Sequence, residues 1–574
     1  MMNTEINSLY ELWVEKTIGD EMLHNELVEI KGDEEAISDR FYRSLEFGTA
    51  GLRGVIGAGT NRMNVYTVNQ ATQGLADFLN DRYEKPSVAI AYDSRINSDV
   101  FSKSAAEVLA ANGIKVYIYP ELVPTPMLSF AVRRLHCQSG IILTASHNPA
   151  KYNGYKCYSY EGYQMTDEEA SKTYEYIKNV DMFKDVKTMS FDDGIKSGII
   201  EYIDSSINEE FYELVLKKRV NPEAPKANGL KLIYTPLNGT GNKPVREVLK
   251  RAGFEDVRVV PSQEMPDGNF PTCPYPNPEI HQAFEEALKL AQEYGADLLL
   301  ATDPDCDRVG IAVNVDNEYK LMSGNEVGVL LAEYLLSSLK EQGKLPKNPV
   351  ITKSFVTTPL VERVAADYDC EVVNLLTGFK YIGEYITKLE KKNESDRFIA
   401  GMEESYGYLA GTHARDKDAV VASLLISEMA AYYKGKGMSL YDVMNSLYEK
   451  YGFYINKLLN FAFEGQSGME KMLGIMDKLR NHTPVQISKL RVIEASDYMK
   501  SERIDTTTGE KSEITLPKSN VLAYKLEGGN SVIVRPSGTE PKLKIYITAC
   551  GKTQELSQRL TNMMAEDMEK ILGV

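Results

Sequence analysis

An apolar run leads directly into three alternating aspartates in Leu298-Leu299-Leu300-Ala301-Thr302-Asp303-Pro304-Asp305-Cys306-Asp307-Arg308. A short apolar run that ends in a polar turn is typical of a buried strand, and α/β sheets usually hold their sites at the carboxyl ends of strands. In an extended chain residues i, i+2 and i+4 point to one side, so we expect Asp303, Asp305 and Asp307 to converge on one cation. The sequence therefore predicts a strand that ends in a cluster of hard oxygen ligands.

The residue after the aspartates, Arg308, would offer a fork of donors to an anion that shares this cation. A solvated acidic turn is the alternative interpretation of an isolated D-x-D-x-D pattern. The buried type of strand in front of it, and an arginine placed where carboxylates repel one another, favour the metal site. An EF-hand is excluded, because its sixth position, here Arg308, should be Gly and its twelfth, here Asn314, should be Glu.

Length and composition set the class of protein. The chain has 574 residues, which is too long for one core, so we expect three to five domains. Its net charge of −17 argues against nucleic acid as a partner, although a local pocket can still bind phosphate. No run approaches the roughly 20 apolar residues of a transmembrane helix, and residues 1–20 lack the apolar core of a signal peptide. The lack of such a run argues against a membrane partner. The six cysteines are scattered without a C-x-x-C pair, which favours a reducing, cytoplasmic setting.

A pattern of short strands followed by polar loops recurs along the chain. It appears at residues 88–95, 141–149, 230–240, 298–308 and 350–354. Pairing these runs predicts an internal repeat of three α/β units, each of which contributes one polar loop to a shared cleft. Those loops carry Ser146, the three aspartates and Glu403-Glu404-Ser405. Residues before about 47 have a helical pattern, and those after about 455 indicate a separate α+β domain.

The loop Thr144-Ala145-Ser146-His147-Asn148-Pro149 offers a serine hydroxyl at the end of a strand. Ser146 with His147 beside it can be a nucleophile with an acid/base neighbour. A serine that caps a helix is the alternative. A hydrolase triad is disfavoured, because the G-x-S-x-G elbow is absent from this loop.

Other polar loops suit phosphates and sugars. The loop 535–542 combines an arginine, two hydroxyls and a glycine, which suits a phosphate, although Pro and Gly also form ordinary turns. The glycine-rich run 47–54 matches neither nucleotide-binding glycine pattern. The Glu403-Glu404 pair could accept hydrogen bonds from sugar hydroxyls or form a charged turn. The alternating charges of Arg415-Asp416-Lys417-Asp418 are typical of a solvated surface.

Taken together, these loops resemble the α-D-phosphohexomutase family, and within it the phosphoglucomutases. The matching motifs are Thr144-Ala-Ser-His-Asn-Pro149, Asp303-Pro-Asp-Cys-Asp-Arg308, Glu403-Glu-Ser-Tyr-Gly407 and Arg535-Pro-Ser-Gly-Thr-Glu-Pro541. They follow the family's order at compatible separations, from about residue 47 to the C-terminus. The N-terminal segment and the overall length are similar to the longer bacterial and animal subgroup. One departure is Met402, where many members have Gly.

The resemblance implies a fold of three similar α/β domains with mixed sheets plus a C-terminal α+β domain around one central cleft. The expected division is a helical arm over 1–46, domain I over 47–205, domain II over 206–321, domain III over 322–454 and a phosphate-binding domain over 455–574. The phosphoserine, the metal ligands and the sugar-binding loop would lie in domains I, II and III.

The resemblance also implies roles for single residues. Ser146 would be phosphorylated, and one oxygen of its phosphoryl group would join Asp303, Asp305 and Asp307 around Mg²⁺. Arg308 would contact the same phosphoryl group. Residues considered for acid/base or charge-stabilising roles are Arg53, His147, Lys156 and Lys417, with Lys156 or His147 as the general base. Residues expected to bind substrate are Glu403 and Ser405 for sugar hydroxyls, Thr377 and Gly378 for specificity, and Arg535, Ser537, Gly538 and Thr539 for the substrate's phosphate.

The implied activity is the interconversion of α-D-glucose 1-phosphate and glucose 6-phosphate through a phosphoserine enzyme. Glucose 1,6-bisphosphate would be the intermediate and activator, and small sugar phosphates the binding partners of a monomer or homodimer. The Glu-Glu-Ser-Tyr-Gly loop resembles the glucose-preferring form, whereas mannose and pentose phosphates are alternative substrates. A Mg²⁺-dependent phosphatase with an aspartate nucleophile and a silent sugar-phosphate sensor are rivals from other classes.

Overall fold

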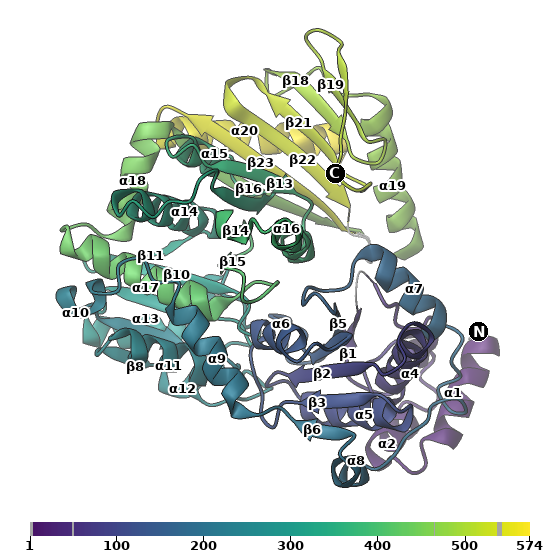
Figure 1. Cartoon of the computed structure of the whole chain (residues 1–574). Coiled ribbons are helices and arrows are strands. Elements are labelled where there is room, and N and C mark those ends of the chain that lie inside the picture. The colour runs from purple at the N-terminus through teal and green to yellow at the C-terminus, as the bar shows by residue number, and fades with distance from the viewer. Residues whose placement is uncertain (1–3, 49–50, 464, 537–541, 574) are drawn as a thin grey trace. The chain divides into compact units, whose positions relative to one another are not determined.

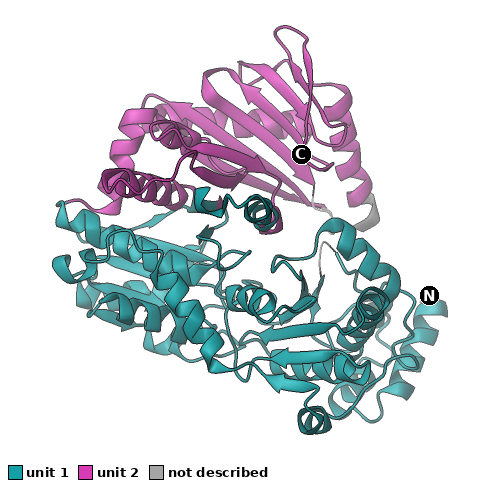
Figure 2. Ribbon diagram, viewed as in Figure 1, with its two compact units in different colours: residues 1–324, 382–401, 405–437 teal, residues 325–381, 402–404, 438–574 magenta. Residues whose placement is uncertain are grey.

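The structure is a computed structural model that describes residues 4–48, 51–463, 465–536 and 542–573 (Figure 1). The chain divides into two compact units, each built from separate stretches of sequence (Figure 2). The first unit contains Met1–Gly324, Ile382–Gly401 and Ser405–Gly437. The second unit contains Asn325–Tyr381, Met402–Glu404 and Met438–Val574.

The first unit opens with three helices, α1 (Thr4–Lys16), α2 (Glu21–Glu29) and α3 (Glu34–Phe41). The side chains of Asp20 and Asp33 cap the second and third helices by accepting hydrogen bonds from backbone N–H groups. Trp13 is fully buried, and its ring meets Phe41 and Phe183 edge to face, with centroids 5.9 and 5.4 Å apart. The helices expected before residue 47 are therefore present, and they pack through an aromatic cluster.

A mixed six-stranded sheet follows, built from β1 (Gly51–Val55), β2 (Ser87–Tyr92), β3 (Lys115–Ile118), β4 (Ser139–Leu143), β5 (Tyr152–Ser159) and β6 (Ile200–Tyr202). Its order is β1-β5-β4-β2-β3-β6. The pairs β4–β2, β2–β3 and β3–β6 are parallel, whereas β5 runs antiparallel to both β4 and β1. The central strands are buried runs of aliphatic residues, as expected for strands that are covered on both faces.

Helices accompany this sheet: α4 (Val65–Arg82), α5 (Ser98–Ala111), α6 (Thr125–Arg134), α7 (Asp167–Ile177) and α8 (Phe191–Ser197). Along the chain they are followed by α9 (Ser205–Leu216), which packs against α6, and α10 (Ala224–Asn228), which packs against α17 (Ala419–Gly435). Leu75 and Leu109, on two of these helices, belong to the same buried cluster as the strand residues Ile90 and Ile141. Burying the apolar stripe of a helix against a sheet removes it from water, which is the main stabilising contribution in such a layer.

The second sheet of this unit consists of β7 (Leu232–Thr235), β8 (Val257–Val259), β9 (Leu298–Thr302), β10 (Val309–Val315) and β11 (Glu318–Met322). Its helices are α11 (Asn242–Ala252), α12 (Pro261–Glu264), the 3-10 helix η1 (His281–Phe284) and α13 (Glu285–Tyr294). The sheet has the order β11-β10-β9-β7-β8, with β9 parallel to β7 and antiparallel to β10. Every residue of β9 is buried, so the strand predicted before the aspartates is confirmed.

The two sheets repeat one topology. The segment β5-β4-β2-β3 of the first corresponds to β10-β9-β7-β8 of the second, with the same parallel and antiparallel pairings. The loop between β4 and β5 carries Ser146, and the loop between β9 and β10 carries the three aspartates. For these two sheets the repeat predicted from the sequence is confirmed. It places both loops at the carboxyl ends of equivalent strands.

The remaining elements of the first unit include two buried strands and a helix whose residues Ala419–Ala431 are all buried. They are η2 (Ser395–Arg397), β14 (Phe398–Glu403), β15 (Gly407–Ala410) and α17 (Ala419–Gly435); the last two residues of β14 and the first three of α16 (Phe379–Lys391) belong to the second unit. Asp418 caps α17 by accepting hydrogen bonds from the N–H groups of Val420 and Val421, at 2.8 and 3.1 Å. Along the chain, Glu403 ends β14 and Glu404-Ser405 follow it, as the serine and aspartate loops follow β4 and β9.

The second unit contains a parallel pair of strands and a larger antiparallel sheet. The pair is β12 (Val350–Ser354) and β13 (Glu371–Leu375), accompanied by α14 (Gly324–Glu341), α15 (Leu360–Ala366) and α18 (Leu440–Tyr451). The larger sheet contains β16 (Phe453–Ala462), β17 (Gln486–Ile487), β18 (Leu490–Asp497), β19 (Glu502–Asp505), β20 (Lys511–Glu513), β21 (Leu522–Leu526), β22 (Asn530–Pro536) and β23 (Lys542–Gly551). Its order is β16-β23-β22-β21-β18-β19-β20, with β17 paired to β18.

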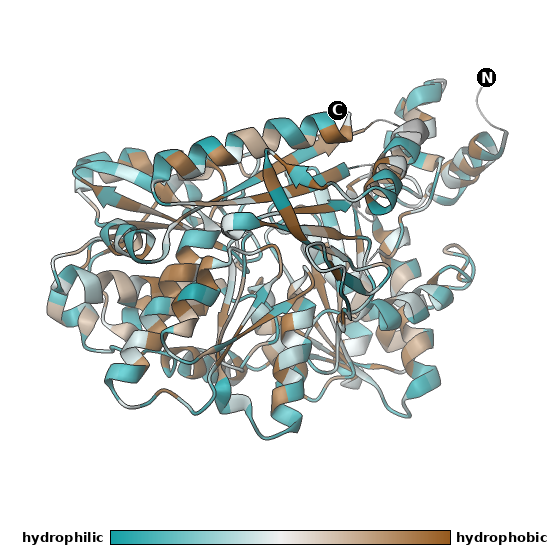
Figure 3. Cartoon of the chain, turned by 90° about the horizontal axis from the view of Figure 1, so that it is seen from above, coloured by the Kyte–Doolittle hydropathy of each residue, from teal (hydrophilic) through white to brown (hydrophobic). Residues whose placement is uncertain are grey.

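Helices α19 (Gly465–Asn481) and α20 (Gln554–Leu572), with the 3-10 helix η3 (Glu527–Gly529), complete this α+β segment. Hydrophobic and hydrophilic residues alternate along α20, which ends beside the C-terminal label in Figure 3. Its Met564 and Met568 are fully buried in the same cluster as Val532 and Ile545 of the sheet. None of the helices in the described part of the chain combines the length and the apolar character needed to cross a bilayer.

Candidate active site

Ser146, in the loop between β4 and β5, has an unusual backbone conformation. Ser146 lies in the turn between β4 and β5 with φ at +51°, a left-handed conformation that costs a non-glycine residue on the order of 1 kcal/mol. Its Oγ donates a hydrogen bond to Asp303 Oδ2 at 2.9 Å, and its N–H donates to Thr144 Oγ1 at 2.8 Å. No helix follows this serine directly, because the next element is β5. The alternative of a helix-capping serine is therefore wrong. The hydroxyl of Ser146 is directed at the aspartate loop between β9 and β10.

Arg95, which no motif in the sequence singles out, holds this turn in shape. The guanidinium of Arg95 donates to four backbone carbonyls of the turn, those of Ser146, Asn148, Pro149 and Tyr152. Its other side faces the buried carboxylate of Asp93, with Nε 3.4 Å from Oδ2, and its plane lies over the ring of Phe270. Four carbonyl acceptors leave no side-chain pattern in a sequence, which is why the role of Arg95 was missed.

The three aspartates converge, but not by the geometry expected from the sequence. Residues 303–307 form a turn rather than an extended strand, and Cys306 has a left-handed φ of +49°. Asp303 Oδ1 accepts hydrogen bonds from the N–H groups of Asp307 and Arg308, at 3.1 and 3.0 Å, so one carboxylate organises the turn. The ligand atoms of the three carboxylates nevertheless lie within 4.8 Å of one another. The predicted convergence is confirmed, whereas the assumed alternation of an extended chain is wrong.

Basic side chains surround the cluster. Lys156 Nζ lies 2.8 Å from Asp305 Oδ2, and Lys417 Nζ lies 3.2 Å from Asp307 Oδ2. Arg308 forms an ion pair with Glu279, with Nη1 2.6 Å from Oε1. Two ammonium groups thus reach the cluster from different parts of the chain, and a guanidinium borders it.

The run Arg415-Asp416-Lys417-Asp418 differs from its expected state. These four residues are buried, and Arg415 is 0% exposed, although alternating charges are typical of a solvated surface. Each charge has a specific partner: Glu390 for Arg415, Tyr158 for Asp416, Asp307 for Lys417 and His413 for Asp418. Buried charges are tolerated when they are paired and hydrogen-bonded, which is the case here.

Burial and mutual repulsion shift the acidities of the cluster. Burial, followed by the neighbouring carboxylates, raises the pKa of Asp303 well above its usual value and raises the pKa of Asp307. Burial acts in the same direction on Asp305, but Lys156 outweighs it and lowers the pKa of that carboxyl. Burial, with Arg308 and Arg53 nearby, holds the pKa of His147 well below its usual value. Carboxylates that are buried this close together repel one another, so the cluster favours a positive charge at its centre.

The donor set fits a small divalent cation. Asp305 Oδ1 and Asp307 Oδ1 are buried and, among the described residues, accept no hydrogen bond. Buried oxygens without a partner cost roughly 1–3 kcal/mol each, and a cation at this point would satisfy both of them. Oxygen ligands of this kind suit Mg²⁺, which keeps part of its water shell and binds through a few carboxylates. The buried aspartate cluster can thus hold a metal.

Two threonines fix the aspartate loop from outside. Thr125, the first residue of α6, donates its hydroxyl to Asp305 Oδ2 at 3.0 Å and its N–H to the carbonyl of Asp305. Thr240 donates its hydroxyl to the carbonyl of Pro304 at 2.9 Å. Supports of this kind orient metal ligands. A Val-Pro-Thr-Pro turn before a helix gave no signal that it would contact a cluster 180 residues away.

Two other predicted residues, Arg53 and His147, lie at the serine loop. The guanidinium of Arg53, on the edge strand β1, donates to Asn148 Oδ1 at 3.4 Å. His147 Nδ1 lies 3.3 Å from Ser146 Oγ, and the ring meets Tyr275 edge to face at 5.9 Å. His147 therefore lies beside the hydroxyl that would carry a phosphoryl group, and Arg53 contacts the loop that holds this hydroxyl.

The loop 405–407 belongs to the first unit and lies beside the aspartate loop. The N–H of Val309 donates to the carbonyl of Tyr406 at 3.1 Å, and Arg308 forms an isolated antiparallel bridge with Gly407. Ser405, a predicted sugar-binding residue, precedes this contact directly. The structure thus brings Ser405, Arg308 and the aspartates into one region.

The other predicted substrate-binding residues lie in the second unit. The N–H of Gly378 donates to Glu403 Oε1 at 2.8 Å, so the loop with Thr377 and Gly378 contacts one of the predicted sugar-binding glutamates. Arg535 lies near the end of β22, opposite Lys544 of β23. Ser537, Gly538 and Thr539 lie outside the described residues.

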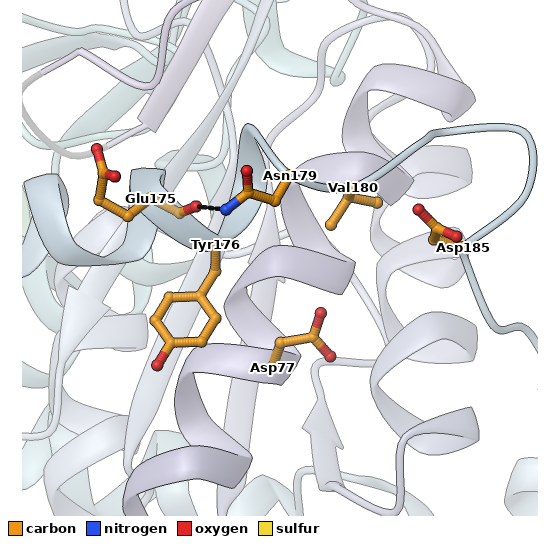
Figure 4. A pocket seen from close by; sticks show the side chains of 6 residues that line it. All are labelled: Asp77, Glu175, Tyr176, Asn179, Val180 and Asp185. Carbon is orange, nitrogen blue, oxygen red and sulfur yellow. Dashed lines mark hydrogen bonds between the residues drawn. The ribbon is translucent and has the colours of Figure 1, made fainter.

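A groove of about 430 Å³ lies elsewhere in the first unit, between α4, α7 and the segment that follows α7 (Figure 4). It is lined by Asp77, Glu175, Tyr176, Asn179, Val180 and Asp185. The dashed line in the figure marks the hydrogen bond from Asn179 Nδ2 to the carbonyl of Glu175, which is 2.7 Å long. None of the predicted site residues lines it, so the chemistry belongs to the serine and aspartate loops.

Comparison with known proteins agrees with this geometry. The sequence matches the descriptions "Phosphoglucomutase/phosphomannomutase, alpha/beta/alpha domain I", II and III over residues 44–184, 209–316 and 323–451. The C-terminal domain of the same family matches residues 488–566. Together these matches cover the serine, aspartate and glutamate loops.

Individual relatives cover nearly the whole chain. A phosphoglucomutase of Staphylococcus saprophyticus is 36% identical over 538 residues, which are 94% of this chain and 96% of the relative. A phosphoglucomutase of Staphylococcus haemolyticus is 35% identical over 92% of this chain and 95% of its own. The solved open form of parafusin, a phosphoglucomutase from Paramecium, shares the fold with a TM-score of 0.69 at 16% identity, over 93% of this chain and 97% of that one. The chain therefore belongs to the phosphoglucomutase/phosphomannomutase family.

Proposed function

We propose that the protein is a phosphoglucomutase that interconverts α-D-glucose 1-phosphate and glucose 6-phosphate through a phosphoserine at Ser146. The observation that carries the proposal is the 2.9 Å hydrogen bond from Ser146 Oγ to Asp303, which couples a hydroxyl nucleophile to a buried, metal-competent carboxylate cluster. The relatives named phosphoglucomutase, about 35% identical over nearly the full length, support glucose phosphate as the substrate.

The reaction consists of two phosphoryl transfers of opposite direction. In the first, the bond between phosphorus and Ser146 Oγ breaks as the free sugar hydroxyl forms a bond to the same phosphorus, and the hydroxyl proton passes to a base. The product is glucose 1,6-bisphosphate, which turns around in the site. In the second transfer its other phosphate returns to Ser146, and the released sugar oxygen recovers a proton. Trace glucose 1,6-bisphosphate would phosphorylate an idle enzyme and so act as the activator.

Positioning and charge neutralisation perform most of the catalysis in such a transfer. Asp303, Asp305 and Asp307 would hold Mg²⁺, which when bound neutralises charge on the transferred phosphoryl group. Lys156 and Lys417 bring ammonium groups to the same cluster, and Arg308 borders it. Their positive charges would stabilise the spread of negative charge over the phosphoryl oxygens in the transition state.

His147 is the better placed of the two candidates for the base. Its Nδ1 lies 3.3 Å from Ser146 Oγ, the oxygen that leaves phosphorus in the first transfer and attacks phosphorus in the second, so it can give that oxygen a proton and take the proton back. Lys156 forms an ion pair with Asp305 at 2.8 Å, and an ammonium in an ion pair has no lone pair with which to accept a proton. We therefore assign proton transfer to His147 and charge stabilisation to Lys156, with Arg53 near the phosphorylated turn.

We assign substrate binding to the residues of three loops. We assign the sugar hydroxyls to Glu403 and Ser405, sugar specificity to Thr377 and Gly378, and the non-reacting phosphate to Arg535 with Ser537, Gly538 and Thr539. The hydrogen bond from Gly378 to Glu403 supports a joint role for the specificity and sugar-binding loops. In this division, residues 47–205 supply the phosphoserine, 206–321 the metal ligands, 322–454 the sugar-binding loop and 455–574 the phosphate loop, behind a helical arm over 1–46.

One contact argues against the phosphatase alternative. Asp303, the aspartate that would attack phosphorus in such an enzyme, accepts hydrogen bonds from Asp307 N and Arg308 N through Oδ1 and from Ser146 Oγ through Oδ2. A carboxylate engaged on both oxygens is a poor nucleophile, whereas the serine it orients is a good one. The same contact argues against a silent sensor, which has no need of an aligned hydroxyl.

The proposal is tested by a coupled assay of glucose 6-phosphate formation from glucose 1-phosphate, with Mg²⁺ and trace glucose 1,6-bisphosphate. We expect turnover by the wild type, a lower rate with mannose 1-phosphate and ribose 1-phosphate, and none by Ser146→Ala. Release of inorganic phosphate by Ser146→Ala at the wild-type rate would establish the phosphatase instead. We place the reaction in the cytoplasm and expect a monomer or homodimer in light scattering.

A further inference from the structure

Lys417 reaches the aspartate cluster along a constrained path. It lies in the turn between β15 and α17, and its Nζ is 3.2 Å from Asp307 Oδ2. Its aliphatic stem passes over Gly407, where a Cβ atom would lie only 2.2 Å from Lys417 Cδ. A lysine has four rotatable side-chain bonds, so keeping its ammonium at one point requires contacts near the end of the chain.

Asp416 provides such a contact. One of its oxygens, Oδ1, accepts a hydrogen bond from the N–H of Lys417 at 2.8 Å and lies 3.2 Å from Lys417 Nζ. The other oxygen, Oδ2, accepts a hydrogen bond from the hydroxyl of Tyr158 at 2.6 Å. Asp416 and Tyr158 are 2% and 0% exposed, so water does not compete for these hydrogen bonds.

Tyr158 remains a donor under ordinary conditions. Burial, and then the nearby carboxylate of Asp416, raises the pKa of Tyr158 well above its usual value. The phenol therefore keeps its proton, and the carboxylate of Asp416 keeps one orientation, with Oδ2 toward the tyrosine and Oδ1 toward the lysine.

Strand β5 thereby influences the positions of both ammonium groups at the aspartate cluster, those of Lys156 and Lys417. Lys156 and Tyr158 are two residues apart on this strand, so their side chains point to the same face of the sheet. Lys156 reaches Asp305 directly, at 2.8 Å. Tyr158 acts on the other ammonium through one intermediate, the carboxylate of Asp416.

The backbone of the turn is fixed by separate contacts. The N–H of Arg415 donates to Ser129 Oγ at 2.8 Å, and its guanidinium pairs with Glu390 at 2.6 Å. Asp418 caps α17 and pairs with His413 at 2.7 Å. Loss of the Tyr158 hydroxyl would therefore free the Lys417 side chain without unfolding the turn.

We propose that Tyr158 and Asp416 are positioning residues, which hold the ammonium of Lys417 against the aspartate cluster during phosphoryl transfer. The proposal rests on the phosphoryl-transfer function proposed above. Neither residue touches the reacting atoms; each acts by reducing the number of positions that the Lys417 charge occupies. A charge fixed before the reaction stabilises the transition state more than one that must be ordered during it.

Tyr158→Phe removes only the hydroxyl, and Tyr155→Phe is its matched control. Tyr155 lies on the same strand and is also fully buried, but its hydroxyl contacts Thr72 Oγ1 of α4 at 3.1 Å. We expect Tyr158→Phe to lower kcat about 10-fold with KM changed less than about 2-fold, because ground-state binding does not need the fixed charge. Tyr155→Phe should keep kcat within about 2-fold of wild type. Equal kcat values for the two variants would overturn the proposal.

A double-mutant cycle separates positioning from a general loss of stability. Lys417→Met alone should lower kcat about 100-fold, and adding Tyr158→Phe to it should lower kcat less than about 2-fold further, because nothing is left to position. Asp416→Asn should show the same coupling to Lys417→Met. This second cycle distinguishes positioning from lost stability if Tyr158→Phe lowers Tm more than Tyr155→Phe does. Multiplicative losses in both cycles would show a merely structural role. Absence of wild-type turnover with any sugar phosphate would instead remove the proposed function, and this proposal with it.

Discussion

The serine loop and the aspartate loop occupy equivalent positions in two sheets of the same topology, yet they are held in opposite ways. The serine loop is fixed through its backbone, by one guanidinium that donates to four carbonyls. The aspartate loop is fixed largely through side chains, because Asp303 binds the turn's own N–H groups and Asp305 accepts from Thr125 and Lys156.

This difference matches what each loop has to present. In the proposed mechanism Ser146 would be phosphorylated and dephosphorylated in every cycle, which requires a side chain that can react on a backbone that stays fixed. Carboxylates that hold a cation must keep their side chains fixed, and buried oxygens achieve this through hydrogen bonds and ion pairs. Variants that damage one loop should therefore leave the function of the other measurable.

The largest effect is expected for Ser146→Ala. Removing the hydroxyl removes the group that carries the phosphoryl, so mutase activity should fall by at least about 10³-fold. The aspartate loop does not need this hydroxyl for its shape, so Mg²⁺ should still bind in calorimetry, with a Kd within about 10-fold of wild type. Residual activity above a few per cent would contradict the assignment of Ser146.

Asp305→Asn should break the other loop. The substitution removes one carboxylate of the cluster, so kcat should fall about 10²- to 10³-fold and calorimetric Mg²⁺ binding should be lost. Incubation with glucose 1,6-bisphosphate, followed by mass spectrometry, measures whether Ser146 is still phosphorylated. Unchanged Mg²⁺ affinity in this variant would place the metal elsewhere.

Arg95→Lys tests the support of the serine loop. A lysine cannot reproduce the fork that reaches four carbonyls, so the free energy of unfolding in urea should fall by about 2–4 kcal/mol. We expect kcat to fall about 10- to 100-fold through misplacement of Ser146, with Mg²⁺ affinity unchanged. Arg134→Lys is the control, since its pair with Glu210 is half exposed and should contribute less than about 1 kcal/mol. An equal loss in the control would refute the special role of Arg95.

The smallest effect is expected when one of two threonine hydrogen bonds to the aspartate loop is removed. Thr125→Val removes a donor to the carboxylate of Asp305, whereas Thr240→Val removes a donor to the carbonyl of Pro304. Support of a ligand orients it directly, so the Kd for Mg²⁺ should rise about 10-fold in Thr125→Val and less than about 2-fold in Thr240→Val. The reverse order would mean that the backbone of the loop, rather than its carboxylates, limits metal binding.

The sequence predicted the parts of the site that leave a local pattern. A buried strand before the aspartates, the polar loop of Ser146 and the clustering of carboxylates all follow from short runs of residue types. The conformation of those loops did not follow, because left-handed backbone at Ser146 and Cys306 is imposed by tertiary contacts. The assumed alternation of an extended chain predicted the correct cluster of three aspartates, although residues 303–307 form a turn.

Residues that act across the fold were beyond sequence reasoning. Arg95 donates hydrogen bonds to backbone carbonyls of the serine loop. Glu279 forms an ion pair with Arg308, and Thr125 donates a hydrogen bond to Asp305. None of these pairs is close in sequence. The buried Lys417 was obscured by its neighbours, since charge alternation usually marks a surface. Only the paired network around it explains why those charges are inside.

The close approach of Lys417 to Gly407 limits how this enzyme could be redesigned. Under the proposed function, the loop 403–407 would be the natural target for changing which sugar is accepted, and Ser405 could be exchanged for other side chains. Position 407 is closed to such changes, because the space that any Cβ would occupy already holds the stem of Lys417. A loop transplanted from a relative with another specificity must therefore keep its last glycine, or bring with it the turn that carries the lysine.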